Sequence, residues 1–154
     1  MKFYGIMLSM IKRVYKKTEN SVYSLKAHVV FCTKYRRPVL TDGVDERLKE
    51  IIAEVCEERG VELIALEVMP EHVHLFVDVP PTISMSSLMH FVKGRASRLL
   101  RQEFPHLKSR LPCLWTGSFF CSSVGGAPVE TVKRYIEEQQ RYVRPKKKSQ
   151  GETA

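Results

Sequence analysis

Two histidines separated by one residue carry the sharpest chemical signal in this sequence. His72 and His74 lie in PEHVHLFVDV, which alternates polar and apolar residues as a strand does. Because side chains alternate between the two faces of a strand, both imidazoles point the same way, with Phe76 and Asp78. Two imidazoles can hold a divalent ion and leave positions open for a further ligand and a substrate oxygen. The pair predicts a metal site on the exposed face of a sheet, but two half-buried polar histidines would give the same tripeptide.

A tyrosine near the end of the chain could supply a nucleophile. Tyr135 and Gln139 stand four residues apart in VETVKRYIEEQQRY, so they share one face of the predicted helix. A tyrosine hydroxyl can attack a phosphodiester, displace its 3′ oxygen and keep the bond energy in a covalent phosphotyrosine. A divalent ion would polarise that phosphate, and Gln139 is placed to complete the metal shell. On the helix alone, a tyrosine packed at a surface boundary is the alternative.

The rest of the pattern predicts the scaffold for these residues. Strands are predicted over residues 25–33, 61–68, 72–79 and 114–121. Helices are predicted from Thr41 or Asp42 to residue 60, from Ser84 to about residue 100, and from Pro128 to about residue 142, with a loop between the second helix and the last strand. This order predicts an α+β fold, a ferredoxin-like or RRM-like antiparallel sheet (βαββαβ) with a C-terminal helix carrying the tyrosine. Two helices would cover one face and leave the other face free for a site.

Three further residues have two interpretations each. His28 lies in the first predicted strand and is expected to be a hydrogen-bonded structural histidine rather than a ligand. Gly94, in the middle of the second helix, either allows close approach of a DNA backbone or marks tight packing. Trp115 is expected in the core or an interface rather than as a platform for bases.

Length, composition and charge narrow the class of protein. A chain of 154 residues suffices for one domain, and no apolar run approaches the roughly 20 residues that span a bilayer. The formal net charge of +8 favours a polyanionic partner such as nucleic acid. The four cysteines form no CxxC pair, which argues against a zinc knuckle or a disulfide framework. No secretory signal is recognised, so the protein is expected in the cytoplasm, away from membranes.

The chain is interpreted as one catalytic domain with two solvated ends. The N-terminal arm covers residues 1–20, the domain residues 21–143, and the basic C-terminal tail residues 144–154. The tail, RPKKKSQGETA from its first arginine, is rich in lysine and carries no apolar pattern.

Several stretches of the chain, in this order and spacing, resemble a known family. They are HVVFCTKYRRPVL, EVMPEHVHLFV, FVKGRASRLL, LWTGSFFCSSVGG and YIEEQ. The chain resembles the single-tyrosine HUH transposases of the smallest prokaryotic insertion sequences, the IS200-like family, over about residues 23–140. No one of these stretches would be specific alone.

The resemblance assigns roles to residues of this sequence. It implies that His72 and His74 are the histidines of the HUH motif, that Gln139 is the third metal ligand, and that Tyr135 is the nucleophile. It implies Mg²⁺ or Mn²⁺ as the ion. It also implies homodimers in which the tyrosine helix of one subunit can complete the site of the other, and hairpins near the element ends as the DNA partner. Cleavage would pass through a 5′-phosphotyrosine, followed by rejoining of the strand.

Basic residues in two clusters are the candidates for contact with that DNA. The first cluster ends the first strand and includes an aromatic residue able to stack on a base; its members are Lys34, Tyr35, Arg36 and Arg37. The second lies within two turns of the second long helix, is continued by Arg101, and consists of Lys93, Arg95 and Arg98. Such clusters can neutralise phosphates, although for any single residue a solvated surface charge is the simpler interpretation.

Three competing hypotheses remain at this point. A ferredoxin-like sheet is also the plan of RNA-recognition modules, but Phe31 and Phe76 do not reproduce their paired aromatics. An HUH replication initiator or relaxase would use the same chemistry, but such proteins usually carry additional domains. An inactive, domesticated transposase that binds hairpins would not need an intact histidine pair, tyrosine and glutamine.

Overall fold

The central feature of the protein is a four-stranded antiparallel sheet with strand order β4-β5-β3-β6. The computed structural model describes residues 15–123. In this sheet, β3 (Lys26–Cys32) and β5 (His72–Asp78) are the two inner strands, and β4 (Glu62–Val68) and β6 (Phe120–Ser123) form the edges. The first and third strands of the sheet therefore lie side by side, as the ferredoxin-like plan requires, and the predicted fold class is confirmed.

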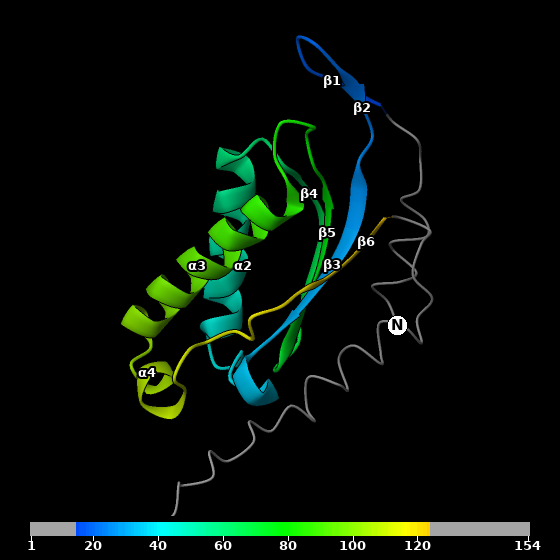
Figure 1. Cartoon of the computed structure of the whole chain (residues 1–154). Helices are drawn as coiled ribbons and strands as arrows, with labels where there is room; N and C mark the ends of the chain where they lie inside the picture. Colours follow the sequence, from blue (N-terminus) through cyan, green and yellow to red (C-terminus); the bar gives the residue numbers. More distant parts are fainter. Residues whose placement is uncertain (1–14, 124–154) are drawn as a thin grey trace, which may run out of the picture.

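Two long helices cover one face of this sheet (Figure 1). α2 spans Val44–Glu58 and α3 spans Met85–Glu103. Their apolar residues recur at helical spacing and pack against the sheet residues Val29, Phe31, Val73, Leu75 and Val77. Because these sheet residues alternate with the histidine positions, the histidines face away from the helices.

The ends of the helices follow recognisable capping patterns. α3 begins as predicted, with the Ser84 hydroxyl accepting from the Ser87 amide at 3.1 Å. The predicted cap of α2 is wrong: its N-cap is Gly43, at φ 94°, and no side chain caps it. α2 ends in a left-handed Gly60, φ 67°, where the Gly60 amide donates to Glu57 and the next amide donates to Cys56.

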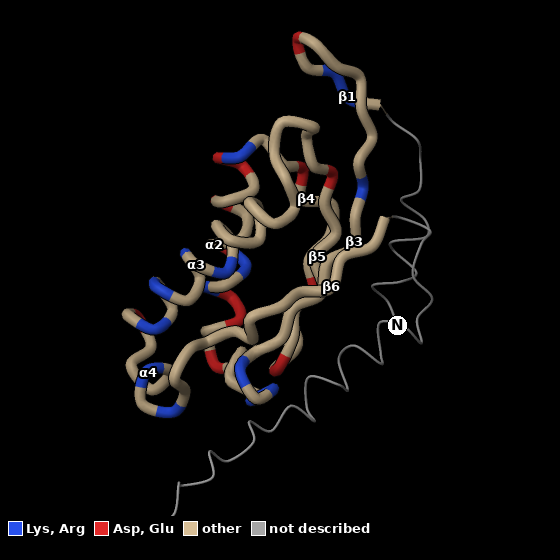
Figure 2. The backbone as a smooth tube through the Cα atoms, in the orientation of Figure 1, with Lys and Arg blue, Asp and Glu red and all other residues tan. Residues whose placement is uncertain are grey.

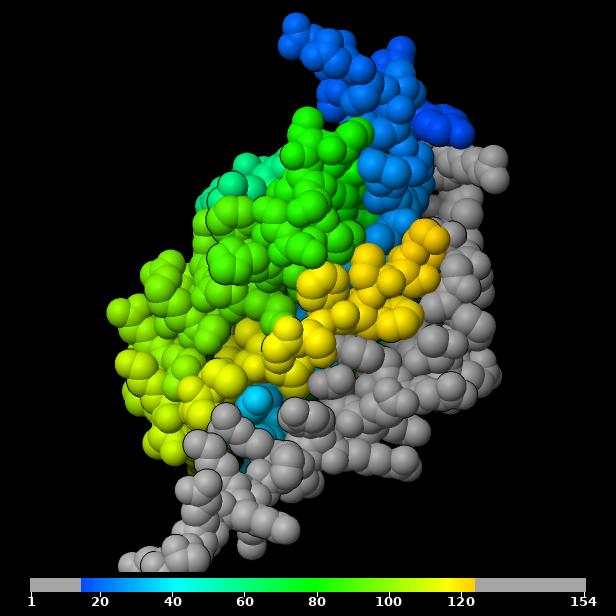
Figure 3. All heavy atoms as spheres, in the orientation of Figure 1, coloured from blue at the N-terminus to red at the C-terminus, as the bar shows by residue number. Residues whose placement is uncertain are grey.

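The fourth strand is shorter than the predicted range 114–121, so this prediction is wrong in its extent. Trp115 makes only an isolated bridge to the end of β3 before β6 begins at Phe120. The stretch between them leaves the sheet because the Lys93 ammonium of α3 donates to two of its carbonyls, those of Thr116 and Ser118, at 2.7 and 3.1 Å. Figure 3 shows this segment, in yellow, on the surface beside α3 and β3.

Several short elements were not predicted. α4 (His106–Arg110) replaces part of the predicted loop after α3, with Leu107 buried beneath it. A small ribbon pairs β1 (Lys16–Lys17) with β2 (Val22–Tyr23), across the predicted boundary between the arm and the domain. Within residues 15–123, no helix is both long and apolar enough to cross a membrane. All four cysteines are free, in agreement with the absence of a predicted disulfide framework.

Candidate functional site

The predicted histidine pair lies on an inner strand of the sheet. His72 and His74 occupy β5 opposite the C-terminal half of β3, and His74 also lies opposite Glu67 of β4. Both imidazoles are on the face turned away from α2 and α3, so the prediction of a shared face is confirmed. The prediction that this face is exposed is wrong, because His72 is only 8% exposed and His74 only 2%.

The histidines share this face with buried apolar side chains of the two inner strands. Val30, Cys32 and Phe76 belong to the same face and are fully buried. His28, also on this face, is 4% exposed. Polar groups in such surroundings are stable only when they find partners within the protein.

The three imidazoles form one continuous chain of contacts. His28 Nε2 lies 3.0 Å from His74 Nδ1, and His74 Nε2 lies 3.2 Å from His72 Nε2. The chain ends at Glu71, whose Oε1 lies 2.9 Å from His72 Nδ1. His28 is thus the hydrogen-bonded histidine that was predicted. It contacts Nδ1 of the His74 ring, whereas His72 contacts Nε2 of the same ring.

Burial keeps these imidazoles in their neutral form. Desolvation lowers the pKa of His28 to about 4, and desolvation together with the charges of its two neighbours lowers the pKa of His74 to about 3. The pKa of His72 is also lowered by burial, which outweighs the opposing effect of Glu71. Neutral imidazole is the form that binds a metal ion.

Glu71 is a site residue that the sequence analysis missed. Besides His72, its carboxylate contacts Arg36 of the loop after β3, whose Nη2 lies 3.4 Å from Oε1. A carboxylate that accepts from a histidine Nδ1–H fixes the ring orientation and its tautomer. The available signal was the acidic residue directly before the pair, in EHVH.

The predicted basic cluster after β3 forms a loop with an unusual backbone. The short 3₁₀ helix η1 spans Lys34–Arg36, and within it Tyr35 and Arg36 have φ angles of 55° and 49°. This left-handed region costs a non-glycine residue about 1 kcal/mol or more. The loop presents the Tyr35 ring at 38% exposure, with the Lys34 ammonium 5.3 Å from the ring centroid, and Arg37 is exposed as well. The β3 residue that pairs with His72 is Cys32, and η1 begins two residues after it, at Lys34.

The predicted basic cluster on α3 separates into different environments. Lys93 is partly buried and holds the segment before β6, as described above, and burial lowers the pKa of its ammonium. Arg95 forms a two-pronged ion pair with Glu58 of α2, at 2.9 and 2.7 Å. Arg98 is exposed. The structure thus gives two of the three residues contacts within the protein, and their contact with DNA stays a prediction.

Two of the predicted site residues, Tyr135 and Gln139, lie outside the described residues, and so does the predicted tail 144–154. Within residues 15–123, no group of three or more His, Cys, Asp and Glu residues is arranged to hold a metal ion. A metal shell with more ligands than the two histidines therefore needs either a residue other than His, Cys, Asp or Glu, or a residue outside 15–123. Trp115, as predicted, is buried, and its Nε1 donates to the Lys93 carbonyl at 3.1 Å.

The fold and the histidine pair define the class as a ferredoxin-like α+β protein with a candidate metal site beside a basic loop. Residues 21–139 match the family described as "Transposase IS200 like". This match covers well over half of the chain, so the chain belongs to the IS200-like transposase family.

Individual relatives agree with this assignment. The chain is 34% identical over 126 residues to the ISDra2 transposase TnpA of Deinococcus radiodurans, covering 80% of this chain and 90% of that protein. It is 28% identical over 126 residues to the transposase for insertion sequence element IS200 of Salmonella typhimurium, covering 80% and 82%. A crystal structure of a transposase candidate from Deinococcus radiodurans R1 superimposes with a TM-score of 0.72 at 36% identity, covering 80% of this chain and 97% of that chain.

Proposed function

We propose that this protein cleaves and rejoins single-stranded DNA at the ends of a mobile element. In this proposal Tyr135 is the nucleophile, and His72, His74 and Gln139 hold Mg²⁺ or Mn²⁺. Membership of the transposase family supports the reaction class, and the matched range, residues 21–139, includes both the tyrosine and the glutamine. DNA hairpins are the proposed partner.

The observation that carries the metal assignment is the contact between the two Nε2 atoms. They lie 3.2 Å apart, and each ring also has a partner on Nδ1, Glu71 for His72 and His28 for His74. If both Nδ1 atoms carry hydrogens, two lone pairs face one another at Nε2, so a proton or a cation is needed between them. Neighbouring ligands at about 2.1 Å from an octahedral ion are about 3 Å apart, which matches this separation. The residues therefore fit a divalent ion.

The proposed chemistry is a phosphoryl transfer to tyrosine. The Tyr135 hydroxyl gives up its proton as its oxygen attacks the scissile phosphorus; a Tyr–O–P bond forms, the P–O3′ bond breaks, and the leaving 3′ oxygen takes up a proton, so that no net proton is released. When bound, the ion polarises the phosphate and offsets charge on its non-bridging oxygens. Attack of a 3′ hydroxyl on the phosphotyrosine reverses these steps and rejoins the strand without ATP. Lys34, Tyr35 and Arg37 would hold the strand next to the histidines.

The test is formation of a covalent adduct on labelled hairpin DNA from the element flanks. With Mg²⁺ or Mn²⁺, we expect an adduct for the wild type and none for Tyr135→Phe, whereas Tyr142→Phe, a nearby tyrosine in the same stretch, should react normally. Gln139→Ala should weaken Mn²⁺ binding, and the adjacent Gln140→Ala should not. An adduct that persists in Tyr135→Phe would refute the nucleophile. Hairpin binding without any adduct would favour a binding module instead.

Assembly into a homodimer with sites completed in trans belongs to the same proposal. Mixing Tyr135→Phe with His72→Ala chains tests it, because each chain keeps the residue that the other lacks. Adduct formation by the mixture, with neither variant active alone, is expected. A mixture as inactive as its components would place the tyrosine and the histidines of one chain in the same site.

A further inference from the structure

One carboxylate oxygen links the candidate metal site to the loop after β3. Oε1 of Glu71 lies 2.9 Å from Nδ1 of His72 and 3.4 Å from Nη2 of Arg36. Figure 2 shows this place, where basic residues of η1 lie beside an acidic residue just before β5. Because the imidazole and the guanidinium share this oxygen, the charge of Arg36 offsets part of the negative charge that acts on His72.

The contact of Arg36 with this oxygen is weaker than another arginine contact of the protein. It is a single contact at 3.4 Å, beyond the usual range of about 2.7–3.2 Å for an N–H that donates to oxygen. Arg95, in comparison, holds both carboxylate oxygens of Glu58 at 2.9 and 2.7 Å. A phosphate that accepted two hydrogen bonds from the guanidinium would therefore compete well for Arg36.

The loop that carries Arg36 is also the proposed contact of the DNA strand. Its backbone turns sharply, with φ 55° at Tyr35 and 49° at Arg36. The Arg36 side chain, 15% exposed, is directed to the carboxylate, whereas Tyr35 and Arg37 on either side of it are exposed. A strand held by these two neighbours places its phosphates within reach of the guanidinium.

Glu71 does not need Arg36 to stay beside the imidazole. The Glu71 carbonyl accepts from the Thr33 amide at 3.0 Å and from the Thr33 hydroxyl at 3.2 Å, which fastens this backbone to the end of β3. The neighbouring Pro70 carbonyl accepts from the Leu40 amide at 2.9 Å. These backbone contacts hold the carboxylate near the ring, so loss of Arg36 should leave it there.

The charge of Arg36 opposes positive charge at the histidine. Burial lowers the pKa of His72, Glu71 opposes this effect, and Arg36 adds to it. A divalent ion at Nε2 would meet the same opposition from Arg36. A carboxylate on Nδ1 raises the basicity of a ligating imidazole, and a carboxylate shared with an arginine does so less.

We propose that Arg36 weakens metal binding at His72 through Glu71, and that a phosphate of the bound strand relieves this effect by taking the guanidinium. Arg36 is then a positioning residue, because it acts on the metal through another side chain. Once the guanidinium has moved to the phosphate, Oε1 accepts from the imidazole alone, which makes Nε2 a stronger ligand. The inference rests on the proposed function, because it takes a divalent ion and single-stranded DNA as the ligands of this face.

Isothermal titration calorimetry with Mn²⁺ on the full chain, without DNA, gives the first test. Arg36→Gln should bind Mn²⁺ about fivefold more tightly than wild type, a gain that a damaged fold would not produce. Arg36→Lys, which keeps the charge, should bind Mn²⁺ like wild type. In the Glu71→Gln background, Arg36→Gln should change Mn²⁺ affinity little, because its effect passes through the carboxylate.

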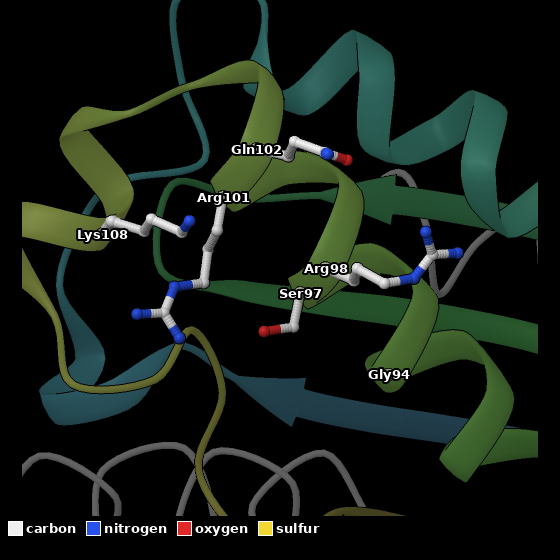
Figure 4. A pocket seen from close by; sticks show the side chains of 6 residues that line it. All are labelled: Gly94, Ser97, Arg98, Arg101, Gln102 and Lys108. Carbon is white, nitrogen blue, oxygen red and sulfur yellow. The ribbon is translucent and has the colours of Figure 1, made fainter.

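Arg101 provides the matched control, because it is another half-buried arginine with a single long contact. It lines a cavity of about 480 Å³ between α3 and α4 (Figure 4), where its Nη2 donates to the Leu111 carbonyl at 3.3 Å. This cavity lies in the helix layer, across the sheet from the histidines. Arg101→Gln should therefore leave Mn²⁺ affinity unchanged.

The exchange with phosphate is tested by linkage to DNA. Fluorescence anisotropy gives the affinity for an unpaired strand with and without Mn²⁺. Because linkage is reciprocal, the factor by which Mn²⁺ raises strand affinity equals the factor by which the strand raises Mn²⁺ affinity. This factor should be about fivefold larger in wild type than in Arg36→Gln. Direct contact between Mn²⁺ and the strand contributes to both proteins, so the difference between them isolates Arg36.

The outcomes separate this inference from the proposed function. Equal or weaker Mn²⁺ binding by Arg36→Gln would overturn it, and so would a gain that persists in the Glu71→Gln background. Equal linkage factors in wild type and Arg36→Gln would overturn the exchange with phosphate. An absence of Mn²⁺ binding in every variant and in wild type would refute the metal site as well. A normal adduct through Tyr135 together with unchanged Mn²⁺ affinity in Arg36→Gln would refute the inference alone.

Discussion

At the scale of single residues, the contacts among three imidazoles determine where protons can reside. His28, His74 and His72 are linked through their ring nitrogens, and Glu71 accepts at the far end. With hydrogens on both Nδ1 atoms of the pair, His28 must present an unprotonated Nε2 to His74. His28 and Glu71 are therefore partners of the same kind, one for each ring of the pair.

The buried histidines should make the metal-free protein sensitive to acid. The folded pKa values of His28 and His74, about 4 and about 3, lie below the ordinary value of 6.5. Between pH 6.5 and 4 these histidines bind protons in the unfolded chain but not in the folded protein. The free energy of unfolding therefore keeps its full value above pH 6.5 and falls as the pH drops from 6.5 toward 4. For His28 alone the loss is on the order of 3 kcal/mol. Urea unfolding between pH 7.5 and 4 measures it.

A variant pair isolates the histidine contribution from that of the carboxylates. His28→Gln should flatten the pH dependence, whereas His90→Gln, at an exposed position, should leave it unchanged. Equal pH dependence in the two variants would show that His28 takes up protons in the folded state as easily as in the unfolded chain.

His28 should also influence metal affinity without binding the ion. His28→Leu removes the acceptor of His74 Nδ1–H, and loss of such an outer partner typically costs 10–100-fold in affinity, so a drop of about that size is expected for Mn²⁺. His28→Gln can still accept and should recover part of the loss. Isothermal titration calorimetry at pH 7.5 gives the affinities. Unchanged affinity in His28→Leu would mean that His74 needs no partner on Nδ1.

At the scale of elements, α3 packs against the sheet with one side and faces solvent with the other. Its buried residues, such as Leu88 and Val92, pack in the core, whereas Gly94 and Arg98 face solvent. Lys93 ties α3 to the segment that leads into β6.

Gly94→Ala separates the structural cost of this glycine from its proposed use. Alanine meets no neighbouring atom and is the better helix former, so the free energy of unfolding should rise by about 1 kcal/mol. Hairpin affinity should fall if DNA comes close to the helix there. Urea unfolding and anisotropy on the same variant give both values. A variant that binds hairpins as well as wild type would exclude close approach at this position.

Lys93→Met tests whether Lys93 acts within the protein rather than on DNA. It removes two hydrogen bonds from a charged donor, with an expected loss of about 3 kcal/mol in stability. Amide hydrogen exchange should become faster between Thr116 and Ser118, while Lys49→Met serves as the surface control. Unchanged stability combined with weaker DNA binding would assign Lys93 to the DNA surface instead.

At the scale of the whole molecule, the sheet separates the histidine face from the helix layer. The histidine pair lies on one face, and α3 with its basic residues lies on the other. The net charge of +8 favours a polyanionic partner in general.

This separation predicts independent effects of variants at the two sites. Arg101→Gln should lower hairpin affinity and leave Mn²⁺ affinity unchanged. His28→Leu should lower Mn²⁺ affinity and leave hairpin affinity unchanged. In the double variant the two losses should add within about 0.5 kcal/mol, because distant sites without shared partners rarely interact. Calorimetry and anisotropy on the four proteins complete the cycle. A larger deviation would reveal coupling through the segment between Leu111 and Lys34.

Local patterns in the sequence were sufficient for the order of the four sheet strands and the two long helices, and for the phase of β3 and β5. Alternation in HVHLFV placed His72 and His74 on one face, and the spacing of apolar residues located α2 and α3. These features depend on residues close together in the chain, which is why periodicity predicts them. The motif series, read in order, was sufficient for the family.

Only the tertiary structure decided which residues meet across long stretches of chain. His28 and His74 are 46 residues apart, and Lys93 and Thr116 are 23 apart, so no local pattern could pair them or foresee the shortened β6. Burial of the histidine face, the ion pair of Arg95 and the convergence of Arg101 with Lys108 arise in the same way. Periodicity determines which side of an element a residue occupies, whereas its partners depend on how the elements pack.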